Sequence, residues 1–275
     1  MNHETIYRMS SIARPLEPEY ATNRAVLFLM PLAAIVASAA AVLGGESVAG
    51  IPSAGLVAAI AVFGTWALGR ELSPDHNVAA FVAMAVGFGA LFVAESVSLL
   101  TLFVALFLAR IVNRTVGLPA RVSDSIAVVL LVFWAVYDLS DPWLAVVAAI
   151  AFCFDAILPE THRPQLVFAA ICLAGFWFSK SQPELNTAVV SSLVPRLQAA
   201  VSVVTIAFII TIARTQRIGS LADATAKALE PARVQAGMLL ALLVALQSLM
   251  LGAEGVQSAA LVWASLAGTS IGSLR

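Results

Sequence analysis

Residues 24–70 read RAVLFLMPLAAIVASAAAVLGGESVAGIPSAGLVAAIAVFGTWALGR. Two apolar runs in this stretch, at 24–45 and 51–69, are joined by a short turn, and an arginine stands at each outer end, Arg24 and Arg70. Each run has about the 20 residues that a helix needs to cross the hydrocarbon core of a bilayer. The stretch therefore predicts a transmembrane helical hairpin with basic residues on one side.

The same pattern continues along the chain. Further apolar spans are predicted at 77–94, 96–112, 122–137, 142–157, 164–179, 196–213, 233–251 and 256–272. Thirteen of the fifteen Lys and Arg residues fall in alternate gaps: Arg8, Arg14, Arg24, Arg70, Arg110, Arg114, Arg121, Arg163, Arg214, Arg217, Lys227, Arg233 and Arg275. Only Lys180 and Arg196 fall in the other gaps. By the positive-inside rule this predicts an all-α polytopic bundle of about ten transmembrane helices in an inner or cell membrane, with both termini cytoplasmic.

Composition agrees with this class. Hydrophobic residues make up 61% of the chain, charged residues 11%, and the mean hydropathy is +0.95. Soluble domains have about 45 to 50% apolar and 25% charged residues, so a soluble domain is excluded. We expect a cytoplasmic segment at 1–23 and one membrane domain at 24–272. Membrane lipids are the expected partners, and nothing in the net charge of −1 suggests a nucleic acid.

The longest uninterrupted apolar stretch is 78–112, which could form one long helix or a hairpin. One helix would reverse every later span and scatter the basic residues over both sides. The charge distribution therefore favours a tight turn near Glu95, Ser96 and Ser98.

Small residues recur at helical spacing, as at Gly64 to Leu68 and Gly268 to Gly272. Such spacing favours close helix packing. The last span is the least lipid-like, which indicates burial inside the bundle or contact in a homo-oligomer or a larger membrane complex. Residues 220–229 place Leu221, Thr225 and Leu229 four residues apart and predict a short amphipathic helix on the membrane surface.

An internal repeat of four helices is a further hypothesis, with halves at 51–137 and 142–251. The corner after the second span holds Pro74, Asp75 and His76, and the corner after the sixth holds Pro159, Glu160 and His162. Two spans later, Arg110 and Arg114 correspond to Arg214 and Arg217. An offset of four spans preserves orientation, so the repeat would be parallel. Chance similarity between apolar segments is the alternative.

Asp155 is the acid that lies deepest in a predicted span. Intramembrane acids usually face a bundle interior or an aqueous cavity and mark an ion, proton or substrate pathway. The alternative is an acid in the last turn that reaches the interface or pairs with Arg163.

Other polar residues at the predicted cytoplasmic ends form a second candidate group. Asp75 and His76, with Glu71 one turn earlier, could transfer protons, or could bind Mg²⁺ together with Asp155, Glu160 and His162. The alternative for Ser73, Pro74 and Asp75 is a helix N-terminus with Ser as the cap and Pro at the first position.

Two pairs of arginines have helical spacing, Arg110 with Arg114 and Arg214 with Arg217. Guanidinium pairs can bind a phosphate or a lipid head group. Arginines at cytoplasmic helix ends also orient a protein in the membrane without any specific ligand.

The placement of Glu71 and Asp75 after the second span, and of Asp155 and Glu160 at the sixth, is similar to that of the acidic clusters in UbiA-type prenyltransferases. The resemblance implies a magnesium-dependent enzyme acting on a phosphate-bearing lipid or isoprenoid, although the paired Asn-Asp-x-x-Asp signature is absent. The intramembrane acid and the repeat instead favour transport of a small or lipid-like substrate through a polar cavity open to the cytoplasm. A third alternative is a non-catalytic scaffold or accessory subunit.

Overall fold

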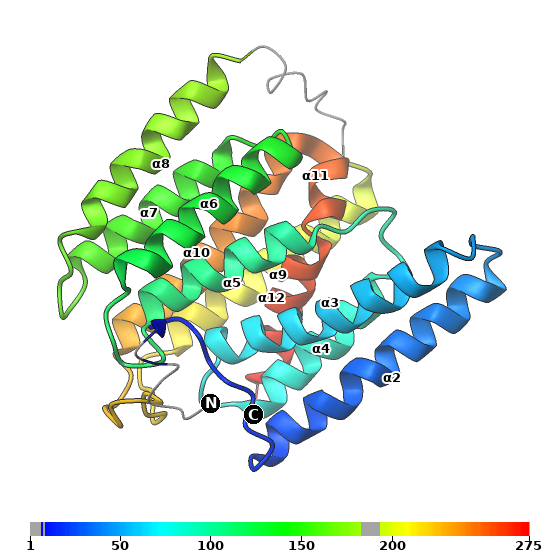
Figure 1. Cartoon of the computed structure of the whole chain (residues 1–275), viewed down its shortest axis with the longest axis horizontal. Coiled ribbons are helices and arrows are strands. Elements are labelled where there is room, and N and C mark those ends of the chain that lie inside the picture. The colour runs from blue at the N-terminus through cyan, green and yellow to red at the C-terminus, as the bar shows by residue number, and fades with distance from the viewer. Residues whose placement is uncertain (1–6, 8, 183–192, 275) are drawn as a thin grey trace.

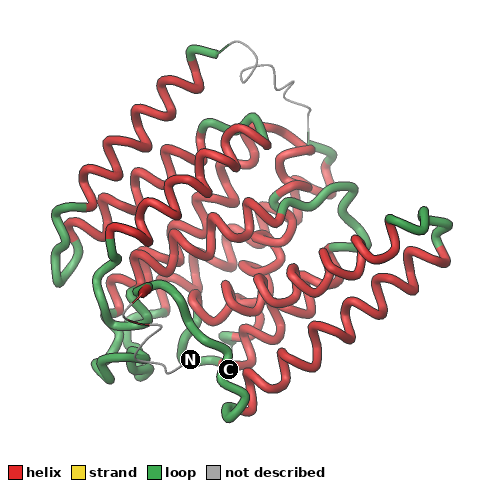
Figure 2. Tube along the Cα trace, viewed as in Figure 1, coloured by secondary structure: helices red, strands yellow, loops and turns green. Residues whose placement is uncertain are grey.

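The computed structural model describes residues 7, 9–182 and 193–274, so Arg8 and Arg275 lie outside the described residues. The described chain consists of helices joined by loops, without a β-strand among its residues (Figure 2). The α-helices are α2 (Ala21–Leu43), α3 (Gly50–Leu72), α4 (Asn77–Ala90), α5 (Leu99–Asn113), α6 (Val122–Asp138), α7 (Trp143–Ile157), α8 (Gln165–Lys180), α9 (Pro195–Arg214), α10 (Pro231–Gln247), α11 (Gly252–Ser258) and α12 (Ala260–Gly272). The all-α prediction is confirmed, and each predicted span contains a helix.

The helices run back and forth along one axis, so the connecting loops gather at two ends (Figure 1). We call one of these the basic end; it comprises 9–20, 73–76, 114–121, 158–164, 215–230 and 273–274. Contacts between distant segments define it: Arg14 Nε lies 2.6 Å from Asp223 Oδ2, and Ser73 Oγ lies 3.3 Å from Ser273 Oγ. The opposite end comprises 44–49, 91–98, 139–142 and 248–259.

Residues 78–112 form two helices joined by a turn and not one long helix, as the charge distribution predicted. Helix α4 ends at Ala90 and α5 begins at Leu99. Ser98 starts α5, because its side chain accepts a hydrogen bond from the backbone N–H of Thr101 at 3.1 Å. The backbone N–H of Ser98 donates to the carbonyl of Ser258 at 2.8 Å, which ties this turn to the end of α11.

Helix α12 is the most enclosed part of the bundle, and it packs against α3, α4 and α9. A Cβ atom added to Gly268 would meet the backbone of Ala83, and one added to Gly272 would meet the backbone of Ala79. The glycines therefore allow α12 and α4 to approach closely, as small residues do in membrane bundles. This confirms that the last span is buried. Its small residues pack against other helices of the same chain.

Four helices are long and apolar enough to cross a membrane: Ala21–Leu43, Gly50–Leu72, Pro195–Arg214 and the continuous stretch Pro231–Ser258. Shorter apolar helices follow at Asn77–Ala90, Leu99–Asn113, Trp143–Ile157, Gln165–Lys180 and Ala260–Gly272. The described chain thus has fewer full-length spans than the ten predicted. Helices α2 and α9 expose large apolar side chains, such as Phe28 and Ile206, which suits contact with lipid.

The predicted amphipathic helix at 220–229 is wrong. This segment is a loop in which the backbone N–H of Ala222 donates to the carbonyl of Lys227 at 2.8 Å, and Leu221 and Ala228 form an isolated antiparallel bridge. Asp223 and Ala224 donate their backbone N–H groups to the carbonyls of residues 115 and 116. Contacts with the neighbouring loop therefore outweigh the local helical pattern.

Candidate functional site

The first ion-pair group at the basic end, the Glu71 cluster, consists of Arg14, Glu71, Arg110 and Asp223. Glu71 is fully buried in the last turn of α3. Its Oε1 atom lies 3.1 Å from Arg14 Nη1 and 3.2 Å from Arg110 Nε. Arg14 also contacts Asp223, so it bridges the two carboxylates. Paired charges make the burial of Glu71 tolerable, because an unpaired carboxylate would be expensive to desolvate.

The second group, the Asp155 cluster, consists of Arg114, Asp155 and Arg233. Asp155 is fully buried in the last turn of α7. Its Oδ1 atom lies 2.8 Å from Arg114 Nε and 2.8 Å from Arg233 Nη1. Arg233 stands in the first turn of α10, and Arg114 follows α5. The cluster therefore fastens three helices together at the basic end.

These pairs correct two sequence interpretations. Asp155 does not pair with Arg163 but with Arg114 and Arg233. Arg110 and Arg114 do not form a common clamp for a phosphate, because each is engaged with a different buried carboxylate. Arg114 turns away from the helical path of α5, since its φ of 50° puts it in the left-handed region.

Asp75 and His76 do not begin helix α4, which starts at Asn77. Asp75 accepts hydrogen bonds from the backbone N–H groups of Gly219 at 2.9 Å and Ser220 at 2.8 Å, and from Ser220 Oγ at 2.6 Å. Partial burial acts to raise the pKa of Asp75, but these hydrogen bonds outweigh it and lower the pKa below its ordinary value. The ionised carboxylate of Asp75 therefore anchors the 215–230 loop.

His76 lies beside Ser73, with Nδ1 3.0 Å from Ser73 Oγ. It also lines a cavity of about 230 Å³ with Arg214 and Arg217, both of which are exposed. Arg214 and Arg217 therefore lie beside Asp75 and His76. Within the described part of the chain, they do not pair with buried carboxylates as Arg110 and Arg114 do. The predicted internal repeat receives no support from these neighbours.

The acidic residues proposed as Mg²⁺ ligands are not brought together. Glu160 is 62% exposed and lies 3.4 Å from Lys227 Nζ, while His162 is only partly buried. Across 7, 9–182 and 193–274, no group of three or more His, Cys, Asp or Glu side chains is placed to hold a metal ion. The two buried carboxylates, Glu71 and Asp155, instead have arginine partners.

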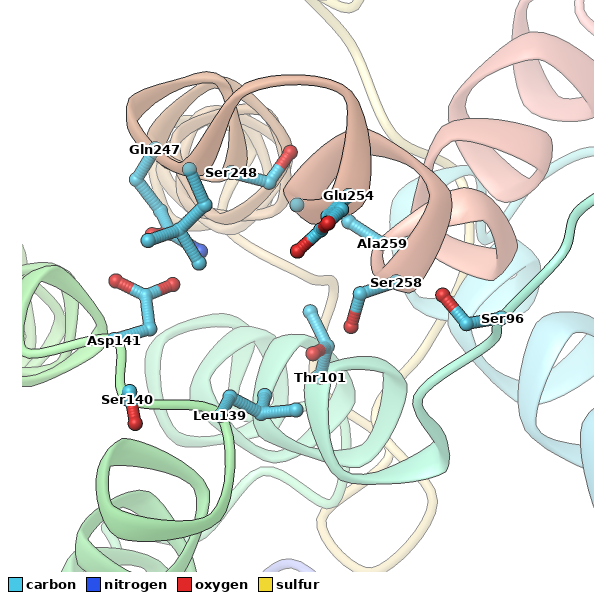
Figure 3. Close-up of a pocket in the computed structure, with 12 residues that line it drawn as sticks. Ser96, Thr101, Leu139, Ser140, Asp141, Gln247, Ser248, Glu254, Ser258 and Ala259 are labelled. Carbon is cyan, nitrogen blue, oxygen red and sulfur yellow. The ribbon is translucent and has the colours of Figure 1, made fainter. Parts of the chain in front are cut away.

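A cavity of about 520 Å³ lies at the opposite end of the bundle, between the start of α5, the α6–α7 loop and the end of α10 (Figure 3). Most of its lining side chains are polar: Ser96, Thr101, Ser140, Asp141, Gln247, Ser248, Glu254 and Ser258. The carboxylates of Asp141 and Glu254 point into the space enclosed by these elements (Figure 3). We call this the acidic cavity.

Asp141 is the most unusual residue of the acidic cavity. It lies in the loop between α6 and α7, is 2% exposed and has no Lys, Arg or His partner within 4.0 Å among the described residues. Its Oδ1 atom accepts a hydrogen bond from the backbone N–H of Trp143 at 3.2 Å. Burial raises the pKa of Asp141 to about 6, with hydrogen bonds from Gln247 and Trp143 opposing the rise.

Sequence analysis missed Asp141 as a site residue, because an acid before Pro142 is typical of a helix N-terminus. One signal was present: the chain has no Lys or Arg from 122 to 162, so Asp141 lacks a cation nearby in sequence. Arg14, Asp223 and Arg233 were also missed as cluster members, since their partners lie far along the chain.

Comparison of the chain with protein-family models, curated proteins and solved structures finds no match. The geometry of the two ends of the bundle is therefore what indicates a function.

Proposed function

We propose that this protein is a multipass membrane carrier that moves a small polar solute, neutral or positively charged, across the bilayer. The observation that carries the proposal is a difference between the two ends of α5, α7 and α10. At the basic end, Arg114, Asp155 and Arg233 fasten these helices together. At the other end, the first turn of α5, the loop before α7 and the end of α10 border the acidic cavity. Among α5, α7 and α10, ion pairs at one end and a cavity at the other are the arrangement expected of one state of an alternating-access carrier.

The lining of the acidic cavity supports this class of solute. Two carboxylates and a set of hydroxyl and amide groups face the space, while no Lys, Arg or His lines it among the described residues. Such a lining favours a cation or a hydroxyl-bearing solute and disfavours an anion. Asp141 also supports proton coupling, because a carboxylate with a pKa of about 6 changes charge near neutral pH.

The sequence predicted a cavity open to the cytoplasm, whereas the acidic cavity lies away from the arginine-rich loops. With the basic end cytoplasmic, this cavity faces outward. The proposal includes ten crossings: four by the long helices, and the others by short helices such as α4 and α7, of 14 and 15 residues. Short spans are accommodated in the interior of a bundle or by local thinning of the bilayer.

A magnesium-dependent enzyme is not proposed, because the arginine partners of Glu71 and Asp155 neutralise the very carboxylates that would bind the ion. No contact in the described chain favours the scaffold alternative.

Thiol labelling tests the proposal without knowledge of the solute. Ser258 lines the acidic cavity, and Ser258→Cys in a background of Cys153→Ala and Cys172→Ala would report access to it from the solvent. Adding Asp155→Asn weakens the closure of the basic end, so a carrier would spend more time in the alternative state. A membrane-impermeant maleimide should then label Ser258→Cys more slowly.

Glu160→Gln is the matched control, because Glu160 is an exposed acid beside the same cluster. It should leave the labelling rate unchanged. Equal labelling rates with and without Asp155→Asn, in protein that elutes as a single folded species, would contradict the proposal.

A further inference from the structure

A second polar cavity, of about 300 Å³, lies at the basic end between the N-terminal segment, the end of α3 and the end of α5. Arg14, Arg70 and Arg110 all line it. Two of these arginines are already engaged, since Arg14 bridges Glu71 and Asp223 and Arg110 contacts Glu71.

Arg70 differs from the other two. Its guanidinium lies over the ring of Trp66, 5.3 Å from the centroid, and its Nη1 atom donates to Asn23 Oδ1 at 3.2 Å. Among the described residues, no carboxylate lies within 4.0 Å of Arg70. A guanidinium has five N–H donors in a planar fork, and only one of them is used here.

The surroundings fix the orientation of Arg70 without neutralising it. The cation–π contact with Trp66 and the hydrogen bond to the side chain of the buried Asn23 hold the guanidinium in place. Of the acids that line the same cavity, Glu71 and Asp223 contact Arg14 rather than Arg70. A positioned cation with free donors is therefore presented to an open, polar space.

We propose that this cavity binds a phosphate group, with Arg70 as the residue that recognises it. The fork of a guanidinium matches two phosphate oxygens, and a guanidinium already held by two contacts loses little freedom on binding. The phosphate can belong to the head group of an anionic phospholipid or be free in solution. Phe63 and Leu16, which also line the cavity, give it an apolar side that suits a lipid. This site is separate from the acidic cavity and does not depend on the proposed transport.

Binding is tested on the purified full chain in a neutral detergent, by titrating dihexanoyl phosphatidylglycerol, dihexanoyl phosphatidylcholine and inorganic phosphate and following thermal unfolding. Phosphatidylglycerol should raise the melting temperature more than phosphatidylcholine, whose choline cancels the charge. Stabilisation by phosphatidylglycerol alone would assign the site to a lipid head group. Stabilisation by inorganic phosphate as well would assign it to the phosphate group itself.

Arg70→Gln should weaken the binding by about tenfold or more, because a charge-assisted contact is lost. Arg24→Gln is the matched control, since Arg24 is an exposed arginine at the start of α2, outside the cavity lining, and should bind as the unmodified protein does. Arg70→Lys retains the charge but not the fork, so it should bind with intermediate strength. If Arg70→Gln does not fold, the affinity of Arg70→Lys tests the role of Arg70. The proposal would be overturned if Arg70→Lys bound as tightly as the unmodified protein, or if Arg24→Gln lost as much affinity as Arg70→Gln. It would also be overturned if neither phosphatidylglycerol nor inorganic phosphate stabilised the protein.

Discussion

Arg233 Nη1 lies 2.8 Å from Asp155 Oδ1 and joins the first turn of α10 to the last turn of α7. Arg114 meets the same oxygen from the end of α5, so one carboxylate oxygen holds three segments. Because this group is buried, removing one charged member costs more stability than breaking an exposed ion pair.

Asp155→Asn should destabilise the protein strongly. The substitution leaves Arg114 and Arg233 buried without their charge partner, and breaking a buried pair in this way costs about 3 to 5 kcal/mol. Thermal unfolding in detergent measures the loss. Glu160→Gln should cost less than about 1 kcal/mol, because that carboxylate is 62% exposed. Similar melting temperatures for the two variants would show that the Asp155 cluster does not fasten the helices.

The stability of the protein should depend on Asp141 in a pH-dependent way. The folded-state pKa is raised from 3.8 to about 6, so the protonated form is favoured in the folded protein. This contribution to stability is complete below pH 3.8 and is lost as the pH rises through about 6. At about 1.4 kcal/mol per pKa unit, the loss amounts to at most about 3 kcal/mol.

Asp141→Asn removes this charge while keeping an oxygen that can accept the hydrogen bond from Trp143. Its melting temperature should therefore exceed that of the unmodified protein at pH 8 and approach it at pH 5. Asp138→Asn is the control, because Asp138 is exposed and lies outside the lining of the acidic cavity. The explanation fails if the Asp141→Asn difference is the same at both pH values. Glu254 is the other titratable side chain of the cavity, and Glu254→Gln checks whether it contributes.

Gly268→Val should disrupt the contact between α12 and α4. A Cβ atom at this position would meet the backbone of Ala83, which cannot move aside as a flexible side chain can. Overpacking of this kind typically costs about 1 to 3 kcal/mol. Gly89→Ala provides the comparison, because nothing lies within 4 Å of the new Cβ atom and alanine favours the helix. Thermal unfolding should show a loss for the first variant and no loss for the second.

Asp75→Ala should free the 215–230 loop. The backbone N–H groups of Gly219 and Ser220 lose their acceptor, so their hydrogen exchange should accelerate while that of α5 does not change. In the unmodified protein the lowered pKa of Asp75 means that this anchoring is present above pH 3.8 and is lost as the pH falls through the folded-state value. Unchanged exchange at both amides would show that Asp75 does not anchor the loop.

The helices could be predicted from the sequence because apolar runs and turn residues are local signals. The predicted span at 122–137 matches Val122–Asp138, and 142–157 matches Trp143–Ile157. The short α11, which covers the predicted turn before 256–272 and the start of that span, was not predicted, since the glycines and the polar residues Glu254 and Gln257 are typical of a turn.

The site could be predicted only in part. Asp155 was identified because an acid in an apolar span is unusual on its own, and Glu71 because it lies one turn before Asp75 at the end of a predicted span. Their partners could not be identified, because Arg14 and Arg233 lie 57 and 78 residues away from them. The amphipathic spacing of residues 220–229 was misleading for the same reason: hydrogen bonds to residues 115 and 116 determine the loop.

Helix α5 carries both clusters, with Arg110 in its last turn and Arg114 just beyond it. Over 15 residues it acts as a stiff rod of about 22 Å, and its first turn borders the acidic cavity through Thr101. A tilt of this rod would move Arg110 and Arg114 together, so the contacts of Glu71 and Asp155 are linked through α5. In the proposed carrier, the two clusters would therefore open together.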